Sequence, residues 1–140
     1  MLKTMDFKAP LDLAEEAHPV AKAIPTGVAA LVGNWTNCDK DTRSLVRAAI
    51  TNAKKGVNVE LFGACHPTPC DWGTMAAHTY APDVSSKNVV AFSTHYKFDF
   101  KETVVTGTLL HAGLLMIELF NHFTDGSDRM DYSTKDYFHR

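Results

Sequence analysis

Three histidines and one glutamate are the residues of this chain best suited to acid–base chemistry. His78, His95 and His122 carry a side chain that titrates near neutral pH, as a general acid or base must. If Glu118 faces the interior, its carboxylate needs one of them or Arg47 as a partner, because an unpaired buried charge is very costly. Such a pair could orient a polar ligand or transfer a proton. A structural ion pair or a rim-exposed glutamate is the more common outcome.

A second group of interest lies between Trp72 and Tyr80. Side chains alternate between the two faces of a strand, so one face here carries Trp72, Thr74, Ala76, His78 and Tyr80. This face combines two aromatic rings, small residues that leave room and an imidazole, a mixture typical of a small-molecule pocket. Alternation does not say which face is inside, so the same residues could instead meet solvent or another subunit.

One short segment holds the compact set of possible metal ligands, namely Cys65, His66, Cys70 and Asp71. Zinc accepts sulfur and imidazole donors, but structural zinc sites usually show closer cysteine pairs repeated in a second knuckle, and the sequence has no such repeat. We therefore expect no metal and no other cofactor, and interpret the segment as a loop stiffened by Pro67 and Pro69.

The cysteine count bears on redox state and on covalent chemistry. Three cysteines without a secretion signal favour reduced thiols, although Cys65 and Cys70 could pair in an oxidising compartment. The chain has no Gly-x-Ser-x-Gly elbow, no phosphate-binding glycine loop and no His-Glu-x-x-His stretch. Covalent catalysis is therefore limited to Cys70 as a conceivable nucleophile.

The elements that must position these residues are predicted to be strands. From Val90 the larger apolar side chains recur at every second position as far as Phe100, and period two is typical of a strand. The pair Lys101-Glu102 breaks this run. Residues 103–111 and 114–123 then form two strands joined across Ala112-Gly113, a hairpin turn that Gly113 can close with a positive φ.

Strand-length segments separated by turn residues also fill the rest of the chain, at 31–37, 44–52, 57–65, 71–80 and 129–138. Together they predict an all-β protein, an eight-stranded antiparallel up-and-down barrel comprising residues 31–140, because about eight strands suffice for closure. A two-sheet sandwich is the alternative. Residues 1–30 are predicted to form an N-terminal arm whose short helix ends near His18-Pro19.

Composition excludes several classes of partner. With 140 residues and a formal net charge of −2, the chain is one domain without the concentrated basic field of a nucleic-acid or anionic-membrane binder. It contains neither a membrane-spanning apolar run nor the apolar core of a signal peptide. We expect a soluble, cytoplasmic protein, or a secreted one if a leader has been removed.

The predicted strand 114–123 is apolar on both faces. Leu114, Met116 and Phe120 share one face, and Leu115 and Ile117 share the other. One face covers the core, and the second cannot be an ordinary wet surface. The pattern predicts a homo-oligomer interface or a ligand-lined cavity, with cover by the N-terminal arm as the alternative.

The residues Gly33-Asn34-Trp35, at the start of the first predicted strand, resemble the Gly-x-Trp motif of the calycin superfamily, which includes lipocalins, fatty-acid-binding proteins and avidins. Residues 31–37 are most similar to the avidin opening. The resemblance implies a small barrel in which the tryptophan packs at the closed end beneath a basic side chain from late in the chain. Arg129 and Arg140 are the candidates for that side chain. The avidin contacts to biotin are not matched, so the resemblance does not imply biotin.

Three functions remain open. The first is binding of a small apolar or amphipathic molecule in the lumen, with the wall formed by Trp72, His78, Tyr80, Phe92, Tyr96 and Glu118. The second is a cofactor-independent isomerase, cyclase or lyase in the same cavity, with His78, His95 or His122 acting against Glu118 or Tyr96. The third is an interaction module using an apolar outer face, which a barrel filled with side chains would favour.

Overall fold

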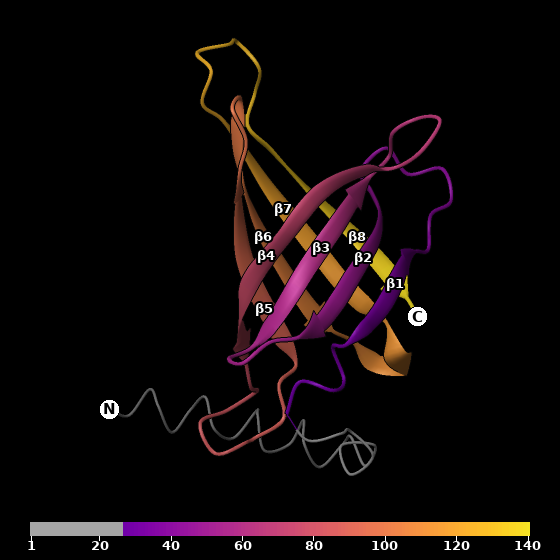
Figure 1. The fold of residues 1–140 in the computed structure, drawn as a ribbon, viewed down its shortest axis with the longest axis vertical. Coiled ribbons are helices and arrows are strands. Elements are labelled where there is room, and N and C mark those ends of the chain that lie inside the picture. Colours follow the sequence, from indigo (N-terminus) through magenta and orange to yellow (C-terminus); the bar gives the residue numbers. More distant parts are fainter. Residues whose placement is uncertain (1–26) are drawn as a thin grey trace.

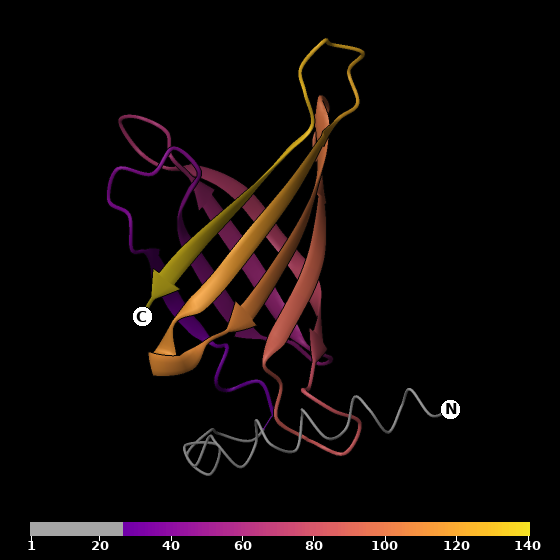
Figure 2. The ribbon, with the colours of Figure 1, turned by 180° about the vertical axis from the view of Figure 1, so that it is seen from behind.

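The computed structural model of the chain describes residues 27–140, which form a closed barrel of eight antiparallel strands (Figures 1 and 2). Each strand pairs with the next along the chain, and the last pairs with the first. The predicted barrel is confirmed, and the two-sheet sandwich is excluded. The strands are β1 (Gly33–Asn37), β2 (Leu45–Asn52), β3 (Val57–Gly63), β4 (Cys70–Tyr80), β5 (Ala91–Lys97), β6 (Lys101–Leu109), β7 (Leu115–Phe123) and β8 (Tyr132–His139).

The turn between β5 and β6 differs from the prediction. Lys101 and Glu102 do not break a strand; they begin β6 and pair with Phe123 and His122 of β7. The turn lies earlier, where the Phe98 N–H donates to the Lys101 carbonyl oxygen at 2.8 Å. Two charged residues can therefore belong to a strand, because the ladder is formed by their backbone groups and does not depend on their side chains.

The predicted β6–β7 hairpin is confirmed. A short 3₁₀ turn, His111–Gly113, joins the strands, and the Leu110 N–H donates to the Leu114 carbonyl oxygen at 2.8 Å. Gly113 has a φ of 75°, as predicted, and Ala112 before it also takes a positive φ of 63°. Two successive left-handed residues match the right-handed twist of the strands they connect.

Side chains fill most of the barrel interior. The inward residues are large and almost inaccessible to a water-sized probe, which leaves little free space beside them. Phe92 is 1% exposed, and its ring lies where a Cβ on Gly107 of the neighbouring strand would be. The other fully buried large side chains of the barrel strands are Trp35, Leu45, Ile50, Val57, Val59, Leu61, Val105, Leu115, Ile117 and Phe138.

A bulge in the β3–β4 pairing changes the direction of the side chains of β4. Glu60 pairs with Thr74, but Phe62 pairs with Asp71, so β4 carries an extra residue near Gly73, which has a φ of 91°. Trp72 packs against the core, and Ala77, opposite the inward Val57, is buried as well. The prediction that Trp72 shares a face with Thr74, Ala76, His78 and Tyr80 is therefore wrong.

The backbone pairing between β4 and β5 is short. These strands pair only at His78–Tyr80 and Ala91–Ser93. Beyond that point side chains replace the backbone ladder, and the Thr94 hydroxyl donates to the Ala76 carbonyl oxygen at 2.8 Å.

The predicted N-terminal helix ending near His18-Pro19 lies outside the described residues. Within 27–140, Ala30 and Leu31 are buried, and Leu31 belongs to the barrel core. No helix in the same range is long and apolar enough to cross a membrane.

Trp35 is held by Arg140, one of the two basic residues expected to cover it. The Arg140 guanidinium lies 4.5 Å from the centre of the indole ring, and its Nη1 donates to the Val32 carbonyl oxygen at 2.9 Å. The indole N–H donates to the Leu31 carbonyl oxygen at 2.8 Å. Gly33 has a φ of 148°, and a Cβ there would approach Arg140 Cδ to 2.7 Å. The Gly-x-Trp motif thus supplies both the ring and the room for the arginine.

Replacing Arg140 with alanine should lower the free energy of unfolding by about 1–2 kcal/mol, because a cation–π contact and a charged hydrogen bond are lost together. Denaturant unfolding measures the loss. Lys135→Ala, on the outer face of β8 opposite Glu118, is the control and should change stability by no more than about 0.5 kcal/mol. Equal effects of the two substitutions would show that Arg140 does not secure Trp35.

Candidate functional site

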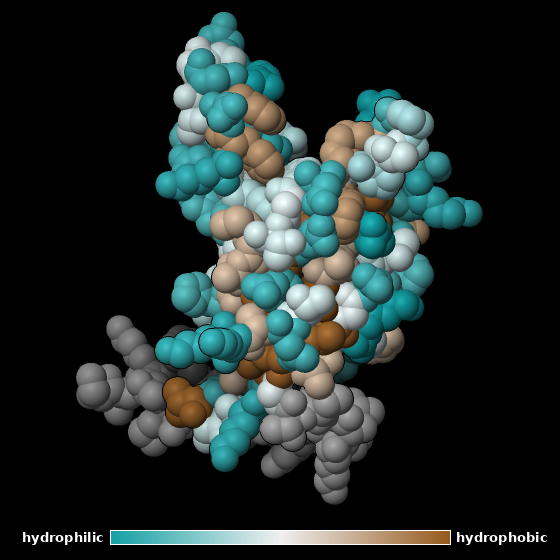
Figure 3. Space-filling model, viewed as in Figure 1, coloured by the Kyte–Doolittle hydropathy of each residue, from teal (hydrophilic) through white to brown (hydrophobic). Residues whose placement is uncertain are grey.

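One end of the barrel opens into a notch. The β7–β8 connection rises on one side, and the β1–β2 and β3–β4 loops stand on the other (Figure 1). Figure 3 shows the hollow between these two projections, with hydrophobic side chains on its walls. The notch is where the filled interior gives way to side chains that solvent can reach.

Aromatic rings gather at this end of the barrel. Trp72 makes edge contacts with Tyr96 and Phe98, at centroid distances of 5.8 and 5.2 Å. Phe98 stacks in turn on Tyr96 at 6.1 Å and on Phe100 at 6.0 Å. Phe100 is 41% exposed, so the series of rings runs from the buried interior to the surface. Such rings give a ligand apolar contact area in fixed geometry.

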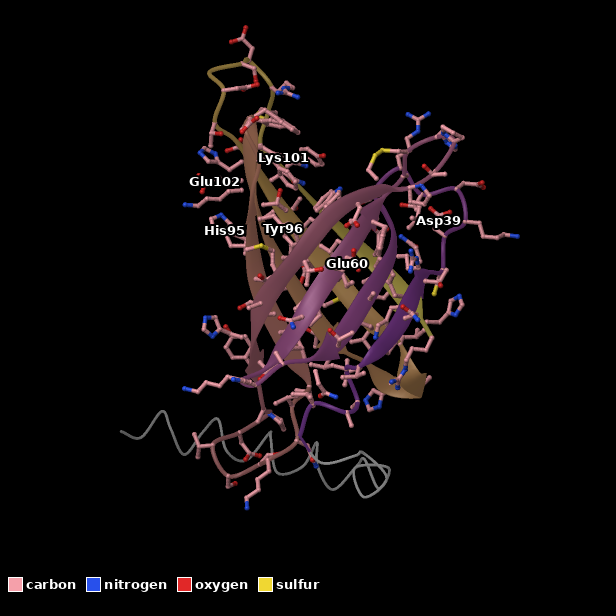
Figure 4. The ribbon with its side chains drawn as sticks, in the orientation of Figure 1. Asp39, Glu60, His95, Tyr96, Lys101 and Glu102 are labelled. Atoms are coloured by element: carbon pink, nitrogen blue, oxygen red, sulfur yellow. A yellow bond between two sulfur atoms is a disulfide. The ribbon has the colours of Figure 1, made fainter. Side chains whose placement is uncertain are left out.

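A lysine stands among these rings. Lys101 Nζ lies 4.9 Å from the Trp72 ring centre and 5.4 Å from that of Phe98, and it donates to Asn121 Oδ1 at 3.0 Å. Figure 4 places Lys101 at the notch and Tyr96 deeper, with His95 and Glu102 on the outer side. We call Trp72, Tyr96, Phe98, Phe100, Lys101 and Asn121 the mouth cluster.

The charge of Lys101 is not balanced by a carboxylate. Among the ion pairs that residues 27–140 form, none includes this lysine. Removal of its ammonium from water lowers the pKa of Lys101, and the positive charge of Arg129 lowers it further. Asn121 is 4% exposed, and its Oδ1 also accepts from the Thr103 hydroxyl at 2.8 Å. A neutral, fixed amide therefore positions the lysine.

Arg129 borders the mouth cluster. Its guanidinium lies 4.2 Å from the Phe123 ring centre and 5.5 Å from that of Phe100. Unlike Lys101, it has a counter-ion, since Nη2 donates to Asp125 Oδ2 at 2.6 Å. Hydrogen bonds from the Ser127 hydroxyl and backbone, together with Arg129, lower the pKa of Asp125 to about 2. The arginine adds positive potential, but much of its charge is already matched.

Tyr96 has a structural role at the β3–β4 bulge. Its hydroxyl oxygen lies 2.7 Å from the Val59 carbonyl oxygen and 2.8 Å from that of Gly73, on the two strands. The single O–H hydrogen is therefore shared between the two carbonyls or donated to one of them at a time. Burial, and next the negative charge of Glu60, raise the pKa of Tyr96, so the phenol stays protonated at neutral pH. Tyr96 is therefore poorly suited to act as a base.

Glu60 and Asp71 form a second polar group, on the outside of the same wall. A hydrogen bond from Asp71 raises the pKa of Glu60, and Arg47 opposes that rise. The Arg47 guanidinium also lies 3.9 Å from the Phe62 ring centre. Arg47 is thus occupied here and is not a partner of Glu118.

Glu118 and the remaining predicted wall residues do not reach the mouth. Glu118 lies on the outer face, opposite Thr106 and Lys135, because Ile117 and Leu119 beside it fill the core. His78 and Tyr80 are exposed, and the Tyr80 hydroxyl bonds Ser93 at 2.7 Å. Phe92 faces inward but in the filled part of the lumen. Of the six predicted wall residues, the structure brings Trp72 and Tyr96 together at the open end.

The predicted acid–base partners are not brought together. His95 Nε2 lies 3.3 Å from Glu102, and His122 Nδ1 lies 2.7 Å from Asp131. The hydrogen bond to Asp131 raises the pKa of His122. Both pairs are on the outside of the barrel, where they flank a hollow of about 520 Å³ that Val104 and Phe120 also line. No pairing of a histidine with Glu118 or Tyr96 is formed in the part of the chain that the structure describes.

The cysteine arrangement also differs from the favoured expectation. Cys65 and Cys70 form a disulfide with their Cα atoms 5.4 Å apart, and Cys38 is free and exposed. The hairpin explains the pairing, because the last residue of β3, Gly63, is opposite Cys70. Within 27–140, no group of three or more His, Cys, Asp or Glu side chains is arranged to hold a metal.

Sequence reasoning missed Lys101, Asn121, Phe98 and Phe100 as site residues. The signal available was the density of aromatic residues from Phe92 to Phe100, directly followed by a lysine. Without the turn position and the bulge, this density does not say which rings meet.

Comparison with known proteins gives no relative, because no protein-family model, curated protein or solved structure matches the chain.

Replacing Tyr96 with phenylalanine should destabilise the barrel by about 1–3 kcal/mol, because the hydroxyl hydrogen that two buried wall carbonyls share is lost while the ring is retained. Tyr80→Phe is the matched control, since its hydroxyl bonds Ser93 at the surface, and it should cost no more than about 0.5 kcal/mol. Denaturant unfolding of both variants decides the matter. A Tyr96 variant as stable as the Tyr80 variant would contradict the structural role.

Proposed function

We propose that the protein binds a small, largely apolar molecule at the open end of its barrel, with the mouth cluster as the site. The observation that carries the proposal is the ring series of Trp72, Phe98 and Phe100, which leads from the core to a surface notch. Burial of apolar area against such rings stabilises a complex by roughly 25 cal/mol per Å². Because the deeper lumen is filled, the ligand lies at the entrance.

The calycin resemblance supports the same class of function. The stacking of Arg140 on Trp35 is the arrangement that the resemblance implies, and it is combined with a closed eight-stranded barrel. The alternative of a barrel isomerase, cyclase or lyase has less support. Its three histidines lie outside the barrel, and its tyrosine is held by backbone carbonyls.

Binding of the neutral fluorophore N-phenyl-1-naphthylamine tests the proposal. We expect saturable binding by the wild-type protein and an approximately fivefold weaker Kd in Phe100→Ser, equivalent to about 1 kcal/mol of lost ring contact. Tyr137→Ser is the matched control, because this ring is 43% exposed against 41% for Phe100 but lies on the outer face of β8, away from the hollow at Val104 and Phe120. Absence of binding, or equal loss in both variants, would contradict a site at the mouth.

The second candidate function is self-association through the outer face of β6 and β7. Val104 and Phe120 are opposite each other in the register, and both are more than two-fifths exposed, at 44% and 43%. They lie between the His95–Glu102 and His122–Asp131 pairs, so an apolar centre has a polar rim, as at protein interfaces.

Light scattering coupled to size exclusion tests this candidate. If the face is an interface, the wild-type chain has the mass of an oligomer, and Val104→Ser with Phe120→Ser shifts it to the monomer mass. The pair Met116→Ser and Thr106→Ser, on the same outer surface but outside the hollow, should leave the mass unchanged. A monomeric wild-type protein at high concentration would exclude this function.

A further inference from the structure

Lys101 carries a positive charge that forms no ion pair with a carboxylate of residues 27–140. An ammonium group carries three N–H donors, and one of them is directed to Asn121 Oδ1 at 3.0 Å. No other acceptor for this group is found among residues 27–140, and its remaining close neighbours are ring faces at 4.9, 5.4 and 5.8 Å. The ring faces attract the charge, but they do not neutralise it.

Lys101 also lies where a bound ligand could reach its charge. Lys101 shares the inward face of β6 with Thr103, which is fully buried, so it is not a freely solvated surface lysine. Its ammonium lies over the aromatic rings that the proposed ligand would touch. A group bound on those rings would therefore lie within reach of this charge.

The surrounding charges favour an anion over a neutral polar group. Arg129 approaches the same Phe100 ring as Lys101, with centroid distances of 5.5 and 5.8 Å, so the two cations add their potentials there. Asp125 forms an ion pair with Arg129 and not with Lys101. Glu60 and Asp71 place negative charge near Tyr96, deeper in the mouth cluster, so the unmatched positive charge lies at the Phe100 end, where Lys101 and Arg129 meet.

We propose that the ligand of the mouth cluster is an amphipathic anion, an aromatic or apolar body carrying one acidic group that pairs with Lys101. The acidic group is a carboxylate, sulfonate or phosphate monoester, because each forms charge-assisted hydrogen bonds with an ammonium. The inference rests on the proposed function, and it adds the charge of the ligand and the residue that selects it.

A matched pair of fluorophores tests the inference. 8-Anilinonaphthalene-1-sulfonate has the same aromatic body as N-phenyl-1-naphthylamine and adds one negative charge. We expect the wild-type protein to bind the sulfonate at least about tenfold more tightly, the gain typical of one charge-assisted hydrogen bond. The preference should weaken as salt is added, because the site is open to solvent.

Two substitutions assign the preference to Lys101. Lys101→Met removes the charge and retains an apolar stem, and Lys101→Gln retains a donor toward Asn121; both should remove the preference for the sulfonate and leave the neutral probe bound. Lys135→Met, on the outer face of β8, is the control and should keep the preference. Unfolding midpoints of all variants establish that the sulfonate reports a folded site.

The outcomes separate the two proposals. If neither probe binds, the mouth is not a ligand site, and both proposals fail. If the neutral probe binds as well as the sulfonate, or if both Lys101 variants keep the preference, only the anionic ligand is excluded. Competition by 1-naphthoate against 1-naphthyl phosphate then shows which acidic group the site prefers.

Discussion

One irregularity in the pairing of β3 with β4 decides which side chains reach the open end of the barrel. The extra residue near Gly73 lets Trp72 pack inward while the positions after it reverse their directions. A bulge leaves backbone groups without ladder partners, and here the Tyr96 hydroxyl from β5 reaches two of the carbonyls. The same ring contacts Trp72, so the interaction that stabilises the wall also fixes the innermost part of the ligand site.

Close packing explains why the site lies at the rim. An eight-stranded barrel has an interior just wide enough for side chains or one small ligand, and in this protein side chains occupy it. Phe92 over Gly107 illustrates the arrangement, because a residue without a side chain on one strand admits a ring from the next. A ligand could enter deeper only by displacing rings of this kind, at a cost of several kcal/mol. The notch requires no such displacement.

How far the sequence predicts this structure depends on the range of the interactions concerned. Alternation and turn residues are local, and they located all eight strands to within a few residues and the Ala112-Gly113 hairpin. The predicted facing of the β4 side chains beyond Trp72 is wrong, because a bulge depends on pairing with the partner strand. Gly73 within the strand was the local sign of it, since a glycine inside a strand often marks a bulge.

The site residues are harder to predict, because which of them meet depends on how the barrel closes. The chemistry of Glu118 and the histidines makes them candidates, yet each lies on an outer face, because its strand neighbours, such as Ile117 and Leu119 on β7, fill the core. The sequence pattern predicts that Lys101 lies in a break between two strands. Its role emerges only when β6 is seen to begin there and to direct the side chain among rings from β4 and from the β5–β6 turn.

The mouth of the barrel differs from the outer surface in whether its charged side chains have partners of opposite charge. On the outer surface, His95 is matched by Glu102 and His122 by Asp131, so each of these two histidines has a compensating neighbour. The whole chain has a formal charge of −2, so a positive mouth does not follow from composition. It follows from placing one lysine where the available partner is a neutral amide. Such a placement costs stability, because a partly desolvated charge without a counter-ion is unfavourable. An anionic ligand would relieve that cost on binding, which connects this partly desolvated charge with the proposed function.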